Sequence, residues 1–204
     1  MLSLDKAYEL VNTKYVNSNP KRLNHILGVA KMAKKLAKIY GVDEEKAEIA
    51  GLMHDYIKFE TIEEMKTMID DCDMLDCSIC EVLHHSYASA NMYKKLGGED
   101  IDIYNAIRNH VFGRVNMSKL EEIILISDYT EENREYKDCI KCREILFEKG
   151  LYEAIYYSTF KTINFVVERG FKPHPTQLEV LRYYEEKLNE VNWCNRRLFK
   201  QSKS

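Results

Sequence analysis

Apolar residues recur at three- and four-residue steps along most of the chain, which is the period of an amphipathic helix. Pro20 and Gly41 bound the clearest run and suit the first position and the end of a helix. The pattern predicts a helix over residues 21–40. Its apolar positions are Leu23, Ile26, Leu27, Ala30, Ala33, Leu36, Ala37 and Tyr40.

Similar runs predict helices along the rest of the chain. Asp43 is expected to cap the next helix, with Glu44 and Glu45 in its first turn. No alternating strand pattern followed by a turn signal occurs, so we expect an all-α fold, a compact multi-helix bundle. We expect residues 1–190 to form a single domain and residues 191–204 a loosely held basic tail. The other expected helices cover 4–17, 62–71, 77–96, 101–112, 118–128, 137–149, 151–169 and 175–189.

Composition narrows the class of protein. The 204 residues are 45% hydrophobic and include only 8 Gly and 3 Pro, which suits one folded domain and excludes a disordered chain. No apolar run approaches the roughly 18 residues of a membrane span, and the N-terminal segment carries acids where a signal peptide would be basic. A net charge of −3 indicates no general nucleic-acid surface. We expect a cytoplasmic protein with neither nucleic acid nor membrane as partner.

Cysteine is the first metal-ligand type to consider, because the chain has six. Cys72, Cys77 and Cys80 have the C-x4-C-x2-C spacing of one ferredoxin class, and Cys139 and Cys142 form a C-x2-C pair. Neither group lies in a Gly- or Pro-containing loop that would present ligands. We therefore favour reduced, mostly buried helix cysteines over a cluster or a zinc site.

Histidine and aspartate form a more informative set. His54 is followed directly by Asp55 at the end of an apolar helix, so both side chains are expected to point inward. His25 lies on the apolar side of the preceding helix, and Asp128 ends the run IILISD. A buried carboxylate needs a compensating cation, and imidazole with carboxylate suits divalent Fe, Mn, Co or Zn.

The order His25, His54-Asp55, Asp128 resembles the signature of the HD superfamily of metal-dependent phosphohydrolases, and Lys58 matches a lysine that often follows the His-Asp pair. The segment PKRLNHILGVA, the pair Leu83-His84, the block AIRNH with Gly113-Arg114, and Asp128-Tyr129 followed by Glu131 and Arg134 resemble blocks of the YqeK-type HD hydrolases. His174-Pro175-Thr176 echoes that family's last motif. Those enzymes split diadenosine tetraphosphate symmetrically into two ADP.

The resemblance implies a role for each matched residue. The metal ligands would be His25, His54, Asp55 and Asp128, with His84 and His110 available for a second metal. Asp55 and Lys58 would be catalytic, through attack of a metal-activated water on the phosphoanhydride. Iron is the preferred metal, with Mn, Co, Ni or Zn as alternatives, as one or two ions. Substrate contacts are expected from Arg22, Lys58, His84, His110, Gly113, Arg114, Asp128, Arg134, His174 and Thr176.

Departures from the family pattern leave alternatives open. His85 stands where the family usually has Gly, so it could crowd the pocket or add a ligand. Another HD reaction, on nucleoside monophosphates or cyclic dinucleotides, a non-catalytic nucleotide or metal sensor, and a purely structural helical adaptor are the alternatives. One of the 14 Tyr could stack on adenine, although core packing suits most of them, and a Tyr-rich C-terminal helix could pair two copies in a homodimer.

Overall fold

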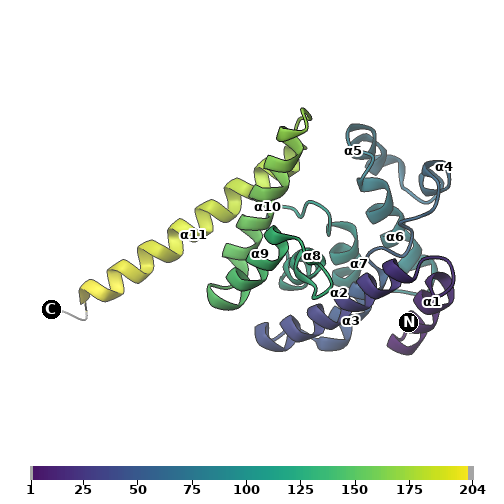
Figure 1. The fold of residues 1–204 in the computed structure, drawn as a ribbon, viewed down its shortest axis with the longest axis horizontal. Helices are drawn as coiled ribbons and strands as arrows, with labels where there is room; N and C mark the ends of the chain where they lie inside the picture. Colours follow the sequence, from purple (N-terminus) through teal and green to yellow (C-terminus); the bar gives the residue numbers. More distant parts are fainter. Residues whose placement is uncertain (1, 202–204) are drawn as a thin grey trace.

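A computed structural model describes the backbone of residues 2–201 and the side chains of residues 2–190. This part of the chain is helical and contains no strand, which confirms the all-α prediction (Figure 1). None of the described helices combines the length and apolar content of a membrane span. The elements are α1 (Leu4–Tyr15), α2 (Pro20–Tyr40), α3 (Glu44–Met53), α4 (Ile62–Lys66), the 3-10 helix η1 (Asp71–Asp73), α5 (Met74–Ile79), α6 (Leu83–Lys95), α7 (Ile101–Arg108), α8 (Lys119–Thr130), α9 (Lys137–Glu148), α10 (Leu151–Glu168) and α11 (Pro175–Gln201).

The predicted start and stop signals act as expected. Asn19 caps α2 by accepting from the Arg22 amide at 3.1 Å, Pro20 is its first residue, and Gly41 ends it in the left-handed conformation with φ 69°. Asp43 caps α3 by accepting from the Lys46 amide at 3.0 Å. These caps set where the two helices that carry the histidines begin and end.

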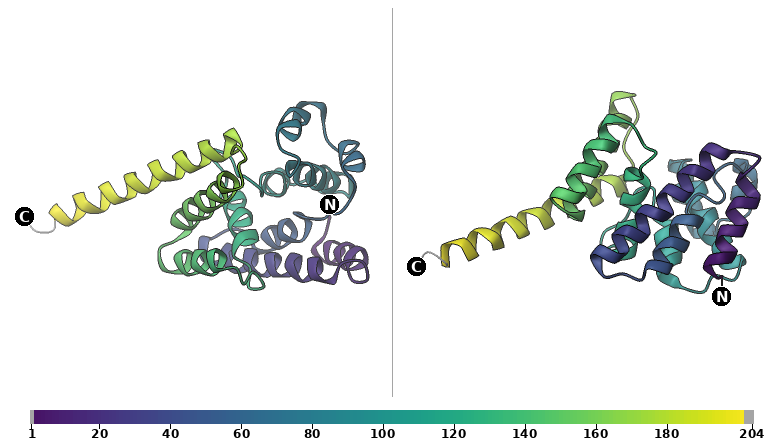
Figure 2. Two further views of the ribbon diagram at one scale, coloured as in Figure 1. Left: turned by 45° about the horizontal axis from the view of Figure 1, so that its top comes forward. Right: turned by 60° about the horizontal axis from the view of Figure 1, so that its bottom comes forward.

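Helix α2 packs against α1, α3 and α8, and these contacts form the base of the main core. Figure 2 shows α4, α5 and α6 on one side of this base and α9, α10 and α11 on the other. Gly51 allows the backbones of α3 and α2 to approach each other closely, because a Cβ at position 51 would lie 2.7 Å from the Cα of Ala30 in α2. This close contact holds the end of α3 beside the middle of α2.

Tyrosine serves mainly the core, as predicted for most of the 14. Tyr15, Tyr93 and Tyr184 are among the largest fully buried side chains. The Tyr15 hydroxyl lies 3.0 Å from the carbonyl oxygens of both Asp55 and Tyr56, so α1 supports the turn after α3. The Tyr184 hydroxyl donates to Glu122 at 2.7 Å and docks α11 on α8.

The prediction of one continuous helix over 77–96 is wrong, because the helix is interrupted. Cys80 is extended, with φ −145° and ψ 105°, and separates α5 from α6. The interruption allows α5 to fold back, so that the Tyr87 hydroxyl donates to Asp76 at 3.1 Å and Cys77 joins Leu83 in a second small core cluster. Tertiary packing overrides the helical period here, without any Gly or Pro to mark the turn.

Other helix ends also differ from the predicted ones, and α1 and α7 end at Tyr15 and Arg108, before the predicted residues 17 and 112. Helix α4 ends at Lys66, which lets the buried side chains of Met65 and Ile69 turn toward the second cluster. Helix α11 runs to Gln201 rather than ending near residue 189. Residues 202–204 and all side chains from 191 onward lie outside the described residues, so the division into a domain and a basic tail stays a prediction.

The buried cysteines behave as ordinary helix residues. Cys77, Cys139 and Cys142 are buried free thiols, and burial raises the pKa of Cys77 to about 11. Among residues 2–190, no group with metal-ligand spacing includes a cysteine. The burial of these thiols favours a role in core packing over a metal cluster.

Gly51→Ala tests the α2–α3 contact. Helix propensity alone would stabilise an alanine there, but the added methyl group meets backbone that cannot move away. We expect the free energy of unfolding to fall by about 1–3 kcal/mol, measured by urea denaturation. Glu45→Ala, at an exposed position of the same helix, should change it by less than about 0.5 kcal/mol. An unchanged or stabilised G51A protein would contradict the proposed tight contact.

Candidate metal centre

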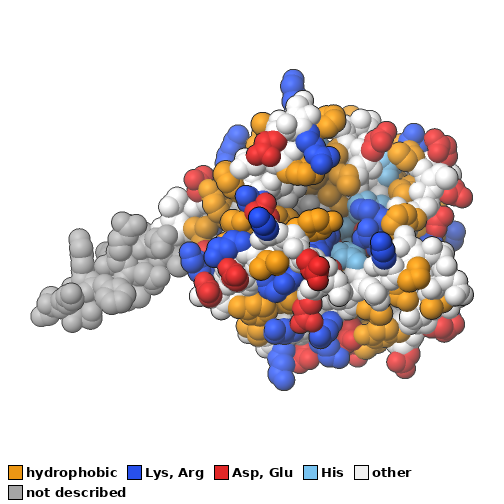
Figure 3. Space-filling view, in the orientation of Figure 1, with side chains coloured by type: hydrophobic (Ala, Val, Ile, Leu, Met, Phe, Trp, Pro, Cys, Tyr) orange, Lys and Arg blue, Asp and Glu red, His pale blue; other side chains and the backbone are white. Residues whose placement is uncertain are grey.

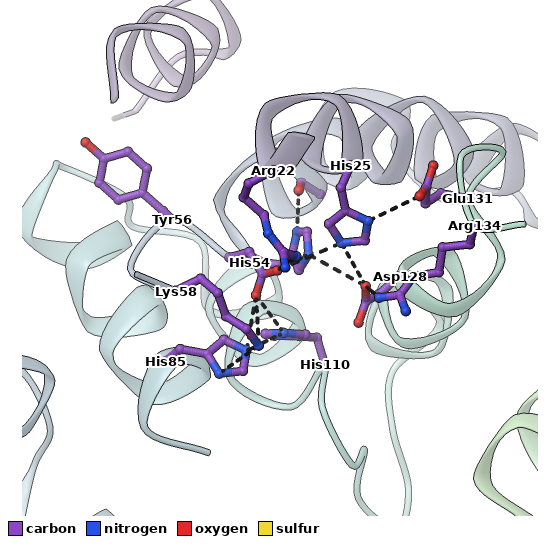
Figure 4. Close-up of polar contacts among 12 residues, drawn as sticks. Arg22, His25, His54, Tyr56, Lys58, His85, His110, Asp128, Glu131 and Arg134 are labelled. Atoms are coloured by element: carbon purple, nitrogen blue, oxygen red, sulfur yellow. Dashed lines mark hydrogen bonds and ion pairs between the residues drawn. The ribbon is translucent and has the colours of Figure 1, made fainter. Parts of the chain in front are cut away.

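Histidine side chains lie beside Lys and Arg in a hollow near the centre of the face shown in Figure 3. Three helices supply the residues beneath it: His25 comes from α2, His54 caps the end of α3 and is followed by Asp55, and Asp128 lies in the last turn of α8. Figure 4 shows the side chains of His25, His54 and Asp128 pointing toward one another. Residues that are far apart in the sequence thus meet in one cluster.

The four predicted metal ligands form a close group. The Nε2 atom of His25 lies 3.0 Å from Asp128 Oδ1 and 3.8 Å from Asp55 Oδ2. The Nε2 atom of His54 lies 3.4 Å from Asp55 Oδ2 and 4.0 Å from Asp128 Oδ1. His25, His54 and Asp55 lie within metal-ligand spacing of one another, and Asp128 has that spacing with His54 and His110.

Hydrogen bonds on the far side of each ring orient the histidines. Nδ1 of His54 lies 2.7 Å from the Gly51 carbonyl, and Nδ1 of His110 lies 2.7 Å from the Ile107 carbonyl. A carbonyl oxygen only accepts, so Nδ1 carries the proton and Nε2 presents a lone pair to the cluster. Nδ1 of His25 is held in the same way, 3.2 Å from the carboxylate of Glu131.

The second oxygen of Asp55 has its own pair of imidazoles. Oδ1 lies 3.1 Å from Nε2 of His85 and 3.5 Å from Nε2 of His110, and the two Nε2 atoms are 3.2 Å apart. Asp55, His85 and His110 thus form a further group with metal-ligand spacing, and Asp55 is shared between the two groups.

His85, and not the predicted His84, occupies the second group. Nδ1 of the buried His84 lies 3.0 Å from the Glu81 carbonyl, and His84 belongs to none of the groups with metal-ligand spacing. Successive residues of an α-helix point about 100° apart, and here His85 faces Asp55 while His84 faces away from it. Of the two outcomes considered for His85, the added ligand fits this geometry.

Several buried atoms of the cluster lack a hydrogen-bond partner, which indicates that a cation belongs there. They include Nε2 of His25, Nε2 of His54 and Oδ1 of Asp55. Burial alone would raise the pKa of Asp55, but His54, His110 and His85 hold that pKa well below its usual value. Burial lowers the pKa of His85 to about 4, so its imidazole is neutral near pH 7. An ionised carboxylate beside the neutral imidazole of His85 is a donor set that fits a divalent metal.

Three basic side chains surround the two carboxylates. Nη1 of Arg22 lies 2.6 Å from Asp55 Oδ2, and Nη2 of Arg134 lies 2.7 Å from Asp128 Oδ1. Nζ of Lys58 lies 3.8 Å from Asp55 Oδ1 and 2.8 Å from Nε2 of His85. Burial lowers the pKa of Lys58, against the opposing effect of Asp55. The site is therefore locally rich in positive charge, although the net charge of the chain is −3.

The remaining predicted substrate residues lie elsewhere. Arg114 makes two 2.7 Å hydrogen bonds to Glu121, a buried carboxylate that also accepts from Asn109, so Arg114 supports the start of α8. Gly113, His174 and Thr176 line a small separate cavity. In that cavity the ring of His174 stacks on Phe112 with centroids 5.2 Å apart.

Glu131 is an important residue that the sequence analysis did not select. Its side chain is buried and holds Nδ1 of His25, and its other oxygen accepts from the Asn133 amide at 2.7 Å. Gly28 makes room for it, since a Cβ at position 28 would lie 2.3 Å from Glu131 Oε2. The glycine three residues after His25 was the signal that something large packs against that turn.

Comparisons with known proteins agree with this arrangement. The chain is 38% identical over 85% of its length to a symmetrical bis(5'-nucleosyl)-tetraphosphatase of Halalkalibacterium halodurans, of which it covers 92%. It is 36% identical over 73% of its length to the enzyme of that name in Bacillus subtilis, of which it covers 81%. The crystal structure of an HD superfamily hydrolase from Clostridium acetobutylicum, described as involved in NAD metabolism, superposes with a TM-score of 0.80 at 36% identity. The match covers 92% of this chain and 99% of that one.

The family assignment rests on the segment that holds the first group. The HD domain is matched over residues 22–133, more than half of the chain. This range includes His25, His54, Asp55 and Asp128, in the order that the sequence analysis used to find them. The protein belongs to the HD domain family.

Proposed function

We propose that this protein hydrolyses diadenosine tetraphosphate, and related dinucleoside polyphosphates, symmetrically into two ADP. The observation that carries the proposal is the convergence of His25, His54, Asp55 and Asp128 with three cations around them. Three relatives that are 30–38% identical to this chain bear the name of that activity. We also propose that the protein acts in the cytoplasm.

The reaction adds one water across the central phosphoanhydride bond and releases ADP from each side. The site must therefore hold a water, neutralise the attacked phosphoryl group and accept a departing anion. His25, His54, Asp55 and Asp128 would hold a divalent cation, most suitably iron, with Mn, Co, Ni or Zn as alternatives. When bound, such an ion activates water and withdraws charge from the phosphoryl oxygen.

Other side chains of the site would bind the phosphates and orient the water. Arg22 and Arg134 lie against the two carboxylates with further guanidinium N–H groups free to reach phosphate, which the planar guanidinium binds in a bidentate way. Lys58 donates to a phosphoryl oxygen as negative charge develops there. Asp55 acts as a hydrogen-bond acceptor that orients the water, and Glu131 keeps His25 in its binding orientation.

The second group, formed by Asp55, His85 and His110, would hold a second cation. Asp55, His85 and His110 offer one oxygen and two imidazole nitrogens within 3.5 Å of one another. The pairing of two copies in a homodimer also belongs to the proposal.

Asp55→Asn tests the activity. The metal-loaded wild-type protein should convert diadenosine tetraphosphate into ADP alone, followed by anion-exchange chromatography, and a chelator should abolish turnover. D55N removes a charge shared by both groups, so kcat/KM should fall by more than about a hundredfold. The same change at exposed Asp5 should have no effect.

Other products would contradict the proposal. Release of AMP with ATP, of nucleoside with phosphate, or of a linear dinucleotide from a cyclic one would assign a different HD reaction. A folded, metal-loaded protein that releases no product from any of these substrates would support the sensor or adaptor alternatives.

His85→Gly tests the second cation, because it restores the residue that the resembling family usually has. After equilibrium dialysis against excess Mn²⁺, elemental analysis should give two ions per wild-type chain and one per H85G chain. His84→Ala should still bind two, since His84 belongs to neither group. Equal stoichiometry in wild type and H85G, or a loss in H84A alone, would contradict the assignment.

A further inference from the structure

A cavity of about 540 Å³ opens directly beside the metal centre. Its volume lies within the range of about 300–1,000 Å³ that is usual for small-molecule sites. The first turns of α2 form one wall, and the segments that follow α3 and α8 complete it. His25, Arg22 and Arg134 line it and also contact the two carboxylates, so these three residues mark its inner end.

The outer end of this cavity is aromatic. Phe59 and Tyr136 line it, although 56% of Phe59 and 73% of Tyr136 are exposed. Phe59 has only an edge contact with Tyr15, at 6.3 Å, and the Arg22 guanidinium 5.4 Å from its ring. Tyr136 precedes α9 but makes no capping hydrogen bond. Neither ring is used by the core, and both belong to the segments that deliver the carboxylates.

Position along the chain ties each ring to the metal centre. Phe59 follows Lys58 directly, and Tyr136 lies two residues after Arg134. Figure 4 shows Lys58 and Arg134 on either side of His25. The two aromatic side chains therefore extend from segments that approach the cavity from different sides of α2.

The charges of the cavity select the class of ligand. Lys21, Arg22 and Arg134 are cationic, and the only carboxylate among the lining residues is Glu131. Both oxygens of Glu131 are already engaged, by His25 and by the Asn133 amide. Cations at the inner end and aromatic rings at the outer end match a ligand with phosphate at one end and a flat π-system at the other.

We propose that Phe59 and Tyr136 form a nucleobase site, which stacks on the adenine of one half of the substrate while its phosphates reach Arg22 and Arg134. This inference rests on the proposed function and adds the residues that recognise the base. Base stacking on aromatic side chains is tolerant of sequence, so the site favours a base over no base more than one purine over another. Asn24, exposed at the same cavity, has an amide that can contact the edge of the base.

Binding of the product ADP tests the site without turnover. Calorimetry on the metal-loaded full chain would compare ADP with inorganic pyrophosphate, which has the phosphates but no base. Phe59→Ala and Tyr136→Ala should each raise the Kd for ADP about tenfold and leave the Kd for pyrophosphate within about twofold. Phe59→Trp, which keeps a stacking surface, should bind ADP as tightly as the wild type.

A matched control and three outcomes make the test decisive. Phe165→Ala removes an equally exposed ring from α10, outside the cavity, and should leave the Kd for ADP unchanged. An unchanged Kd for ADP in F59A or in Y136A overturns the two-sided site, while ADP release by the wild type leaves the proposed function intact. An equal loss of pyrophosphate binding overturns it too. A folded, metal-loaded wild type that neither binds ADP nor releases it from substrate overturns both proposals.

Discussion

The buried carboxylate of Asp55 is the constraint on which the rest of the site depends. It sits 3% exposed among four imidazoles, an arginine and a lysine, and a charge in that position is unfavourable unless its neighbours compensate it. The compensation comes from α2, the turn after α3, α6 and the segment after α7. Each of these elements must be in place for the carboxylate to remain ionised, so the fold and the metal centre form one cooperative arrangement.

The cluster is also oriented from outside. His54 and His110 are held by carbonyl oxygens three residues earlier in the chain, and His25 is held by Glu131. The lone pairs that face the centre are therefore positioned by protein hydrogen bonds and need little rearrangement to receive an ion. Arg22 and Arg134 approach from the cavity side, where an anionic substrate would enter.

Much of this could be predicted from the sequence, and the exceptions have physical causes. Helical periodicity and caps predicted α2 and α3 closely, and the order of His and Asp predicted the first metal group. Periodicity could not reveal the interruption at Cys80, because tertiary contacts of Cys77 and Tyr87 stabilise it. The motif match selected His84, whereas the structure places its neighbour His85, about 100° away around α6, beside Asp55 and His110. Arg114 matched a pattern, yet its guanidinium is committed to Glu121.

Helix α1 contributes no ligand, yet the hydroxyl of Tyr15 lies against the backbone of Asp55 and Tyr56. The family match begins at residue 22, after this helix, and ends at residue 133, before α11 docks through Tyr184. The segment covered by the HD domain match is therefore smaller than the part of the chain that packs into the main core. A truncated protein cut at those homology boundaries would keep every metal ligand in its sequence and lose the scaffold that holds Asp55 in place.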